Sequence, residues 1–268
     1  MATVLDRILA DKQIEVENCR AQVPLDHLKR QAAGLARCRN FFKAVTKPNP
    51  RGINVIAEVK QASPSAGVIR PHLDPVTIAT AYHRCGADAI SVLTDQKYFG
   101  GRLEYLTAVK QAVPVPVLRK DFIIDPYQVY ESRAAGADAV LLIGEALTLG
   151  ELSDLIILAA ELTLTVLLEV HDADVLLKVR SLIGFPKKGN TVLGINNRNL
   201  ATMQVDLNTT GRLAGLAGDV DGLIAESGIK TRSDVKKLAA AGATAVLIGE
   251  TLCRDPNIED KFNELFGR

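Results

Sequence analysis

Three segments of the chain repeat one another, and this repeat constrains the fold more than any other feature of the sequence. They are CGADAISVLT at 85–94, AGADAVLLIG at 135–144 and AGATAVLIGE at 241–250. In each copy an alanine-rich stretch ends at a glycine (Gly86, Gly136 or Gly242), where a left-handed helix cap is natural. A short, β-branched apolar run follows at once. Each copy therefore predicts a joint at which a helix ends and a strand begins.

Five further apolar runs have the length of strands. They are INVIAEV at 53–59, VPVLRKD at 115–121, LTVLLEV at 164–170, TVLGIN at 191–196 and DGLIAES at 221–227. Candidate helices lie between the strands, and several begin with Asp or Ser, residues that cap helix N-termini. These helices include 74–84, 103–112, 125–135, 149–162, 172–183 and 232–241.

Strict alternation of strands and helices predicts right-handed crossovers and a parallel sheet. Eight such units in 268 residues favour a closed (β/α)8 TIM barrel of the α/β class, which typically needs about 250 residues. The alternative is an open Rossmann-type sheet, but the chain lacks its GxGxxG turn after a strand. We expect one domain over residues 1–268.

Residues 1–50 precede the first predicted strand and form an N-terminal helical extension. One helical stripe carries Leu5, Ile8, Leu9, Lys12, Val16 and Cys19, and LDHLKRQAA after Pro24 predicts a second short helix. We expect the extension to pack on the barrel or to cover the mouth of its active site. A pair of helices that binds a partner protein is the alternative.

Composition limits the partners and the compartment. Lys plus Arg number 32 and Asp plus Glu 31, so no net field would hold nucleic acid or an anionic membrane, and we expect neither as a partner. The four cysteines are far apart and have no nearby histidines at zinc-ligand spacing, which favours a reducing cytoplasm and no metal site. No segment has the length of a membrane span or of a signal peptide's apolar region. A transit peptide that had already been removed would leave no trace.

Polar residues end five of the predicted strands. In a parallel barrel these C-terminal strand ends form the active site. Side chains alternate along a strand, so Glu58 and Lys60 share a face, and the polar residues of the other strand ends can point at the same central space. Those residues are Lys120, Glu169, Asn196 and Glu226. Any one of them alone is as well explained by a structural ion pair.

Lysines among carboxylates at an apolar barrel mouth have a chemical use. Ionised glutamates raise the pKa of a neighbouring lysine and burial lowers it. If the carboxylates dominate, Lys120 is a held ammonium that can donate a proton to a developing oxyanion. If burial dominates, the same lysine can be a Schiff-base nucleophile. The sequence leaves both alternatives open.

Glycines after the last two strands predict a phosphate site. Gly228 in ESG and Gly249 in IGE stand where barrels commonly hold a phosphate on backbone amides and the N-terminus of a short helix. Ser63, in the loop after the first strand, offers a hydroxyl from another side. Phe99 and Phe122 follow the second and third strands, where they can sandwich an aromatic substrate. His171 is interpreted as a hydrogen-bonding loop residue rather than a metal ligand.

The successive strand-end motifs resemble those of the indole-3-glycerol-phosphate synthase family, in order and over nearly the whole chain. They are VIAEVKQASPSAG, SVLTDQKYFGG, VLRKDFIIDPYQ, VLLIGEAL, LLEVHD, LGINNRNL, IAESGI and LIGETL, and TVLDRILADKQIEV resembles the family's leading helix. The resemblance implies a cofactor-free lyase of tryptophan biosynthesis. Its substrate would be the phosphorylated, anthranilate-derived 1-(2-carboxyphenylamino)-1-deoxyribulose 5-phosphate, which closes to the indole with loss of carbon dioxide and water. We expect a monomer.

The resemblance also implies roles for the catalytic residues. Lys120 would be the general acid at the ketose carbonyl, and Glu169 would be its partner acid or base in dehydration. Glu58 would orient the substrate and move protons, while Lys60 would pair with the substrate's carboxylate or phosphate. The division of the acid role between the two lysines is left open. Two further residues share this machinery, Asn196 as a hydrogen-bonding group and Glu226 as a group that steadies the lysines.

Binding residues follow from the same resemblance. The anthranilate ring would lie among Phe99, Phe122 and Leu200, with Arg198 supporting the polar network. Ser63 and the backbone after the last two strands would hold the phosphate, and that backbone belongs to Ser227, Gly228, Gly249 and Glu250.

Three positions depart from the family's pattern. Ala66 stands where many relatives have Lys, Arg102 where Ser is common, and Glu250 where some relatives have Ser. A carboxylate beside a phosphate would repel it, so the side chain of Glu250 should turn away and leave only its backbone N–H for the anion.

Three other functions are alternatives to this one. Phosphoribosylanthranilate isomerase would want a cysteine at the end of the first strand, where this chain has Glu58 and Lys60. A class I aldolase stays possible from Lys120 alone. A scaffold barrel that binds a partner through its N-terminal helices is the non-catalytic alternative, and the mutually consistent ring of active-site residues argues against it.

Overall fold

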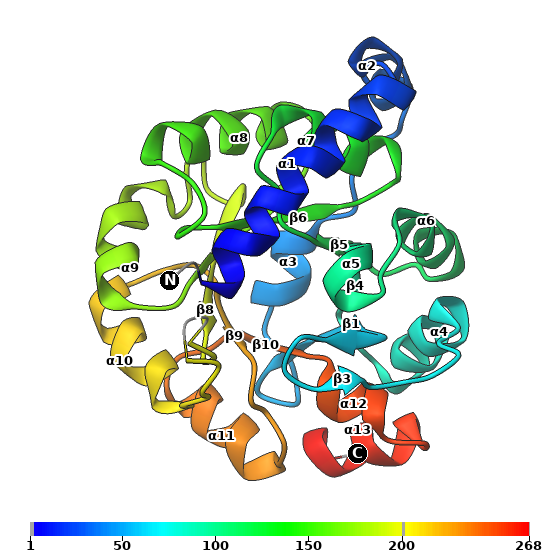
Figure 1. Ribbon diagram of the computed structural model, residues 1–268. Helices are drawn as coiled ribbons and strands as arrows, with labels where there is room; N and C mark the ends of the chain where they lie inside the picture. The colour runs from blue at the N-terminus through cyan, green and yellow to red at the C-terminus, as the bar shows by residue number, and fades with distance from the viewer. Residues whose placement is uncertain (1–2, 200–201, 268) are drawn as a thin grey trace.

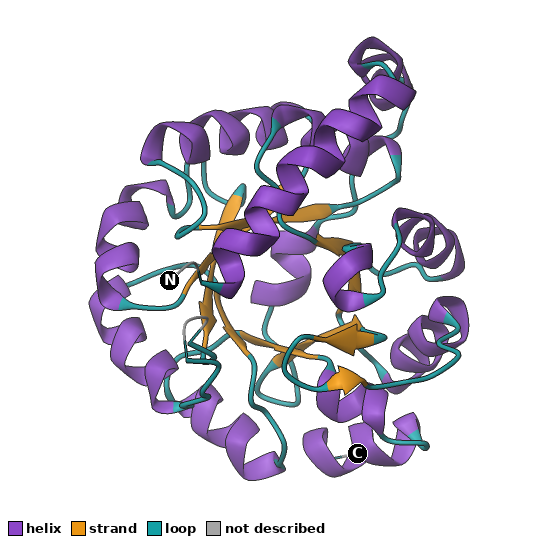
Figure 2. Ribbon diagram, in the orientation of Figure 1, coloured by secondary structure: helices purple, strands orange, loops and turns teal. Residues whose placement is uncertain are grey.

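The computed structural model describes residues 3–199 and 202–267, and its eight long strands close into a parallel barrel (Figures 1 and 2). Around the barrel the strands follow the order β1-β10-β9-β8-β7-β6-β5-β4. Their bounds are β1 Asn54–Val59, β4 Ala89–Leu93, β5 Val117–Lys120, β6 Ala139–Ile143, β7 Thr165–Val170, β8 Thr191–Asn196, β9 Leu223–Glu226 and β10 Ala245–Ile248. The eight predicted strands and the TIM barrel are confirmed. A two-stranded hairpin, β2 Ala62–Ser63 and β3 Gly67–Val68, follows β1 and was not predicted.

Helices surround the barrel and follow its strands (Figure 2). The first half of the chain has α1 Val4–Gln22, α2 Leu25–Ala33, α3 Phe41–Thr46, α4 Pro75–Cys85, α5 Gln96–Phe99, α6 Leu103–Ala112 and α7 Pro126–Ala134. The second half has α8 Leu149–Glu161, α9 Ala173–Val179, the 3-10 turn η1 Arg180–Leu182, α10 Asn208–Ala217, α11 Arg232–Ala240, α12 Glu250–Arg254 and α13 Ile258–Phe266. None of the helices among the described residues has both the length and the apolar character that a membrane crossing requires.

The repeated segments are explained by their glycines and by the residue two positions later. Gly86, Gly136 and Gly242 have φ of 92°, 95° and 96°, which is the left-handed conformation that lets each helix end and turn into a strand. Asp88 then accepts a hydrogen bond from the backbone N–H of Val55 on the neighbouring strand, at 3.0 Å.

The other two copies make the same contact. Asp138 accepts from the N–H of Val117 at 2.9 Å, and Thr244 accepts from the N–H of Leu223 at 3.3 Å. The motif therefore fastens the N-terminal ends of adjacent strands, at the end of the barrel opposite the cavity described below.

Small and branched side chains fill the inside of the barrel. Alternate residues of each strand face inward, as period-2 geometry requires. A buried inner cluster includes Ile56, Leu118, Leu167 and Ile224, and Phe41 and Val45 of α3 belong to it. Helix α3 therefore closes one end of the barrel. The predicted catalytic residues lie at the other end, which stays open.

The N-terminal extension packs on the barrel. Thr3 caps α1 through a capping box with Asp6, and α1 runs across the open end of the ring (Figure 1). Leu5, Ile8 and Lys12 from the predicted stripe are buried.

Candidate active site

The open end of the barrel holds a cavity of about 1130 Å³. Every predicted site residue lines it except Leu200, which lies outside the described residues. Side chains of α1 form part of its wall: Val4, Leu5 and Ile8.

Lys120 stands at the centre of the polar cluster. Its side chain is 14% exposed, and its Nζ lies 2.8 Å from Glu169 Oε2 and 3.4 Å from Glu226 Oε2. Burial lowers the pKa of Lys120, but the charges of Glu169, Glu226 and Glu58 outweigh burial, so the net pKa lies above its ordinary value. Lys120 is therefore an ammonium at neutral pH.

Glu169 receives three partners. Lys120 lies against one of its oxygens, and the other oxygen accepts a hydrogen bond from Asn196 Nδ2 at 3.1 Å and lies 3.2 Å from His171 Nε2. Burial raises the pKa of Glu169, but Lys120 and His171 lower it by more than burial raises it. The net pKa therefore lies well below its ordinary range. Glu169 is therefore an ionised carboxylate.

His171 is the site residue whose role the sequence did not reveal. Its Nδ1 lies 3.1 Å from Glu145 Oε1, so the imidazole bridges two carboxylates. Burial lowers the pKa of His171, but the adjacent carboxylates of Glu145 and Glu169 outweigh burial and raise the pKa to about 10. The ring is an imidazolium within the polar network rather than a simple loop hydrogen-bonding group.

Glu226 has the opposite behaviour. Burial first, and then repulsion by Glu169, raises the pKa of Glu226 to about 8, although Lys120 opposes both. A Cβ at position 194 would lie 2.5 Å from Glu226 Oε1, so Gly194 on the neighbouring strand leaves the space that this carboxyl group occupies. These effects favour the protonated form of Glu226.

A proton on Glu226 would balance the charges of the cluster. The cations are Lys60, Lys120 and His171, and the carboxyl groups are Glu58, Glu145, Glu169 and Glu226. Three positive charges face four carboxyl groups, and protonation of one carboxyl group makes the cluster neutral. Protonation of Glu226 would also turn its contact with Lys120 from an ion pair into an ammonium beside a carboxylic acid.

Glu58 and Lys60 lie on the same face of β1 and its continuation, as the alternation predicts. Their side chains form an ion pair at 2.5 Å. A Cβ at Gly249 would lie 2.4 Å from Glu58 Oε1. The glycine after β10 therefore gives Glu58 its space, which is a second reason for glycine there besides the predicted phosphate contact.

The predicted phosphate residues lie together on the β9 and β10 side of the cavity. Ser227 and Gly228 have φ of 67° and 79°, which turns the chain sharply after β9. The carboxylate of Glu250 accepts a hydrogen bond from Arg254 at 3.0 Å, so its charge is paired along α12. Arg254 and Lys230 also line the cavity and were not singled out from the sequence.

The two aromatic rings lie close to each other across the cavity from these glycines. The ring centroids of Phe99 and Phe122 are 6.0 Å apart with an interplanar angle of 37°. Arg198 donates from its backbone N–H to Asn196 Oδ1 at 3.0 Å and from its guanidinium to the carbonyl of Met203 at 3.2 Å. Ser63 lies on the β2–β3 hairpin, and its Oγ accepts from the N–H of Ala66.

The charged residues at the centre of the site are carboxyl groups and lysine amines that form ion pairs. Among residues 3–199 and 202–267, no group of three His, Cys, Asp or Glu side chains is placed to hold a metal ion. The arrangement instead offers a held proton on Lys120, a carboxyl group of raised pKa at Glu226 and an ionised acceptor at Glu169. Such a set can protonate one atom of a substrate and deprotonate another.

Comparison with known proteins agrees with the motifs. The family model described as "Indole-3-glycerol phosphate synthase" matches residues 5–265. The chain is 48% identical over 264 residues to an indole-3-glycerol phosphate synthase of Geobacillus kaustophilus, covering 98% of this chain and 97% of that protein. It is 46% identical over 268 residues to the indole-3-glycerol phosphate synthase of Neisseria gonorrhoeae, covering 99% of this chain and 100% of that protein.

Solved structures extend the likeness of fold. A 3-hexulose-6-phosphate synthase matches with a TM-score of 0.64 at 19% identity, covering 80% of this chain and 98% of that one. A thiamine phosphate pyrophosphorylase from Pyrococcus furiosus matches with a TM-score of 0.56 at 15% identity, covering 81% and 96%. At these identities the likeness concerns the barrel alone.

Proposed function

Because the chain belongs to the indole-3-glycerol phosphate synthase family, we propose that its cavity closes the indole ring of 1-(2-carboxyphenylamino)-1-deoxyribulose 5-phosphate by lysine and glutamate acid–base catalysis. The observation that carries the proposal is the ammonium of Lys120, held 2.8 Å from Glu169 inside the cavity. An ammonium of raised pKa is a proton donor and a poor nucleophile, which favours general-acid chemistry over a Schiff base.

The first step forms the carbon–carbon bond. The ring carbon that bears the carboxylate attacks the ketone carbon, and Lys120 gives its proton to the carbonyl oxygen, which becomes a hydroxyl group. The carbon–carboxylate bond then breaks, carbon dioxide leaves, and the electron pair restores the aromatic ring. Lys60, paired with Glu58 at the cavity wall, would meet the substrate's carboxylate before it leaves.

The second step is dehydration. Glu169 removes a proton from the methylene carbon beside the ring nitrogen, the new double bond forms, and the hydroxyl group leaves as water after protonation by the site's acid. The acid that protonates the leaving hydroxyl group is one of the two lysines, Lys120 or Lys60. Asn196, which donates to Glu169, keeps that carboxylate aimed at the substrate.

Binding groups surround these reacting atoms. Phe99 and Phe122 would hold the anthranilate ring, and Arg198 would support the polar network of the site. Ser63 and the backbone N–H groups of Ser227, Gly228, Gly249 and Glu250 would hold the phosphate. The ion pair between Glu250 and Arg254 supports this placement, since the carboxylate charge is compensated by a neighbouring cation.

The substitution Lys120→Met tests the proposal. Methionine keeps most of the length and the apolar stem, so the variant should fold and still bind a reduced, non-reactive substrate analogue. The value of kcat should fall by roughly 10²-fold to 10⁴-fold, the usual contribution of a positioned acid. Near-normal turnover would refute the role of Lys120, and a borohydride-trapped adduct on this lysine in the wild type would favour the aldolase reading.

A further inference from the structure

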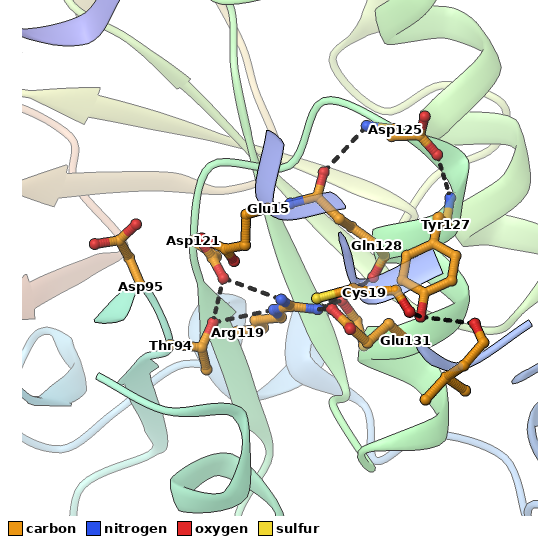
Figure 3. Close-up of polar contacts among 12 residues, drawn as sticks. Glu15, Cys19, Thr94, Asp95, Arg119, Asp121, Asp125, Tyr127, Gln128 and Glu131 are labelled. Atoms are coloured by element: carbon orange, nitrogen blue, oxygen red, sulfur yellow. Dashed lines mark hydrogen bonds and ion pairs between the residues drawn. The ribbon is translucent and has the colours of Figure 1, made fainter. Parts of the chain in front are cut away.

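A buried lysine of the N-terminal helix lies beneath the mouth of the cavity, outside the set of reacting groups. Lys12 of α1 is 1% exposed, and its Nζ lies 3.0 Å from Asp95 Oδ2, 2.9 Å from Asp121 Oδ1 and 2.9 Å from Glu15. Figure 3 shows the carboxylates of this cluster, with Glu15 of α1 beside Asp121 and with Asp95 on the neighbouring loop. The helix thus places one ammonium between two strand ends, those of β4 and β5.

Asp95 connects this ammonium to the first aromatic ring. Asp95 is the N-cap of α5, and its Oδ1 accepts a hydrogen bond from the N–H of Tyr98 at 2.7 Å while its Oδ2 faces Lys12. Helix α5 ends at Phe99, the next residue after Tyr98. The position of the Phe99 ring therefore depends on a carboxylate that Lys12 holds.

Asp121 makes the same connection to the second ring. Its Oδ1 faces Lys12 and also accepts from the N–H of Phe122 at 2.8 Å. Its Oδ2 accepts from Thr94 Oγ1 at 2.6 Å and from Arg119 at 3.0 Å (Figure 3). With every lone-pair direction of this carboxylate engaged, the backbone between Lys120 and Phe122 has one fixed course.

Docking of the helix does not by itself require a buried charge. Leu5, Ile8 and Val16 already supply an apolar contact face on α1. A buried ion cluster gains little stability over apolar residues of similar volume, because desolvation offsets the attraction. The ammonium instead fixes a geometry, because it holds two carboxylates that follow different strands next to one another.

We propose that Lys12 is a positioning residue, which sets the spacing of Phe99 and Phe122 and so the slot for the substrate's aromatic ring. The inference rests on the proposed function, which places the anthranilate ring between these phenylalanines. The N-terminal helix would then shape the substrate site rather than bind a partner protein.

The substitution Lys12→Met tests this proposal through a split between ring and phosphate binding. Binding of the reduced, non-reactive substrate analogue should weaken about tenfold, the scale on which misplaced aromatic contacts act. Competition by inorganic phosphate should be unchanged, because the phosphate residues lie on the β9 and β10 side. Arg20→Met is the matched control, since it removes a half-exposed cation of the same helix that pairs with Asp125 and not with Asp95 or Asp121. This control should bind the analogue as the wild type does.

A second variant covers the case in which Lys12→Met fails to fold. Asp95→Asn keeps a good cap for α5 and leaves Lys12 its other two carboxylates, so this variant should fold. The analogue should bind about threefold more weakly, again with phosphate competition unchanged. Wild-type affinity in Asp95→Asn, or in a folded Lys12→Met, overturns the proposal.

Phe99→Ala separates this inference from the function on which it rests. If Phe99→Ala weakens binding of the analogue and neither Lys12→Met nor Asp95→Asn does, the ring site stands and the role of Lys12 fails. If Phe99→Ala has no effect on binding, the ring site itself is wrong.

Discussion

The imidazolium of His171 makes the stability of the protein depend on pH in a defined direction. Its ring lies between Glu145 and Glu169, and its pKa rises from an ordinary value near 6.5 to about 10 on folding. A group whose pKa is raised in the folded state contributes its full stability below the unfolded pKa. That contribution is lost as pH rises through the folded value.

The magnitude follows from the size of the shift. One pKa unit corresponds to about 1.4 kcal/mol, so a shift from 6.5 to about 10 corresponds to about 5 kcal/mol, lost between these two pH values. The ring is almost fully buried, so solvent screening does little to reduce this value. Replacing His171 with glutamine, which is polar but cannot ionise, removes the proton-linked part of this stability.

Urea denaturation at pH 7, 8 and 9 measures the effect. The free energy of unfolding of the wild type should exceed that of His171→Gln at pH 7, and the difference should shrink by about 1.4 kcal/mol for each pH unit. His27→Gln, on the exposed side of α2, controls for the loss of a histidine. A difference that stays constant from pH 7 to pH 9 would show that the folded protein holds His171 neutral, and the charge balance of the site would have to be redrawn.

Three further substitutions test other parts of the structure. Glu226→Gln imitates the protonated acid, and the pKa of Glu226 is raised on folding to about 8. In urea titrations the wild type should therefore lose stability relative to this variant as pH rises from 4.5 through 8. A constant difference in the free energy of unfolding would mean that Glu226 stays ionised. Arg102→Ser supplies the side-chain cap that α6 lacks, so thermal unfolding should show a gain of about 1 kcal/mol, and an unchanged midpoint would contradict the capping argument. Gly249→Ala pushes a methyl group against Glu58, so steady-state kinetics should show kcat falling about tenfold along with a higher KM; a change in KM alone would assign Gly249 to phosphate binding only.

Local patterns were enough to predict the barrel. The glycines that end helices and the β-branched runs that follow them lie within a few residues of each other, so Gly86, Gly136 and Gly242 identify strand starts without knowledge of the fold. The helix at Asn208–Ala217 was not singled out, because two internal glycines weaken its propensity and its N-cap, Leu207, makes no side-chain hydrogen bond. The β2–β3 hairpin has strands of two residues, too short for any alternation to appear.

The placement of the site residues was predictable for a similar reason. Alternation along a strand determines which way Lys120, Glu169 and Glu226 point. Contacts between residues far apart in the sequence cannot be inferred from a local pattern. The two residues whose roles were missed both form ion pairs with residues on other segments of the chain. Lys12 meets carboxylates after β4 and β5, and the sequence shows it only as a polar member of an apolar stripe. The second missed residue, His171, acquires its charge from Glu145, which belongs to the loop after the preceding strand.

Closure of the barrel has a consequence during synthesis of the chain. In the pairing of β1 with β10, Asn54 lies beside Ala245 and Ala57 beside Ile248. The first barrel strand to leave the ribosome therefore stays without this partner until the last strand has been made. Until then β1 and the newest strand are open edges, with unpaired amides and carbonyls that attract other chains. Contacts between residues so far apart in sequence also form slowly. A nascent chain that stalls before residue 245 therefore cannot close its barrel, and we expect chaperones and proteases to handle it as an unfolded protein.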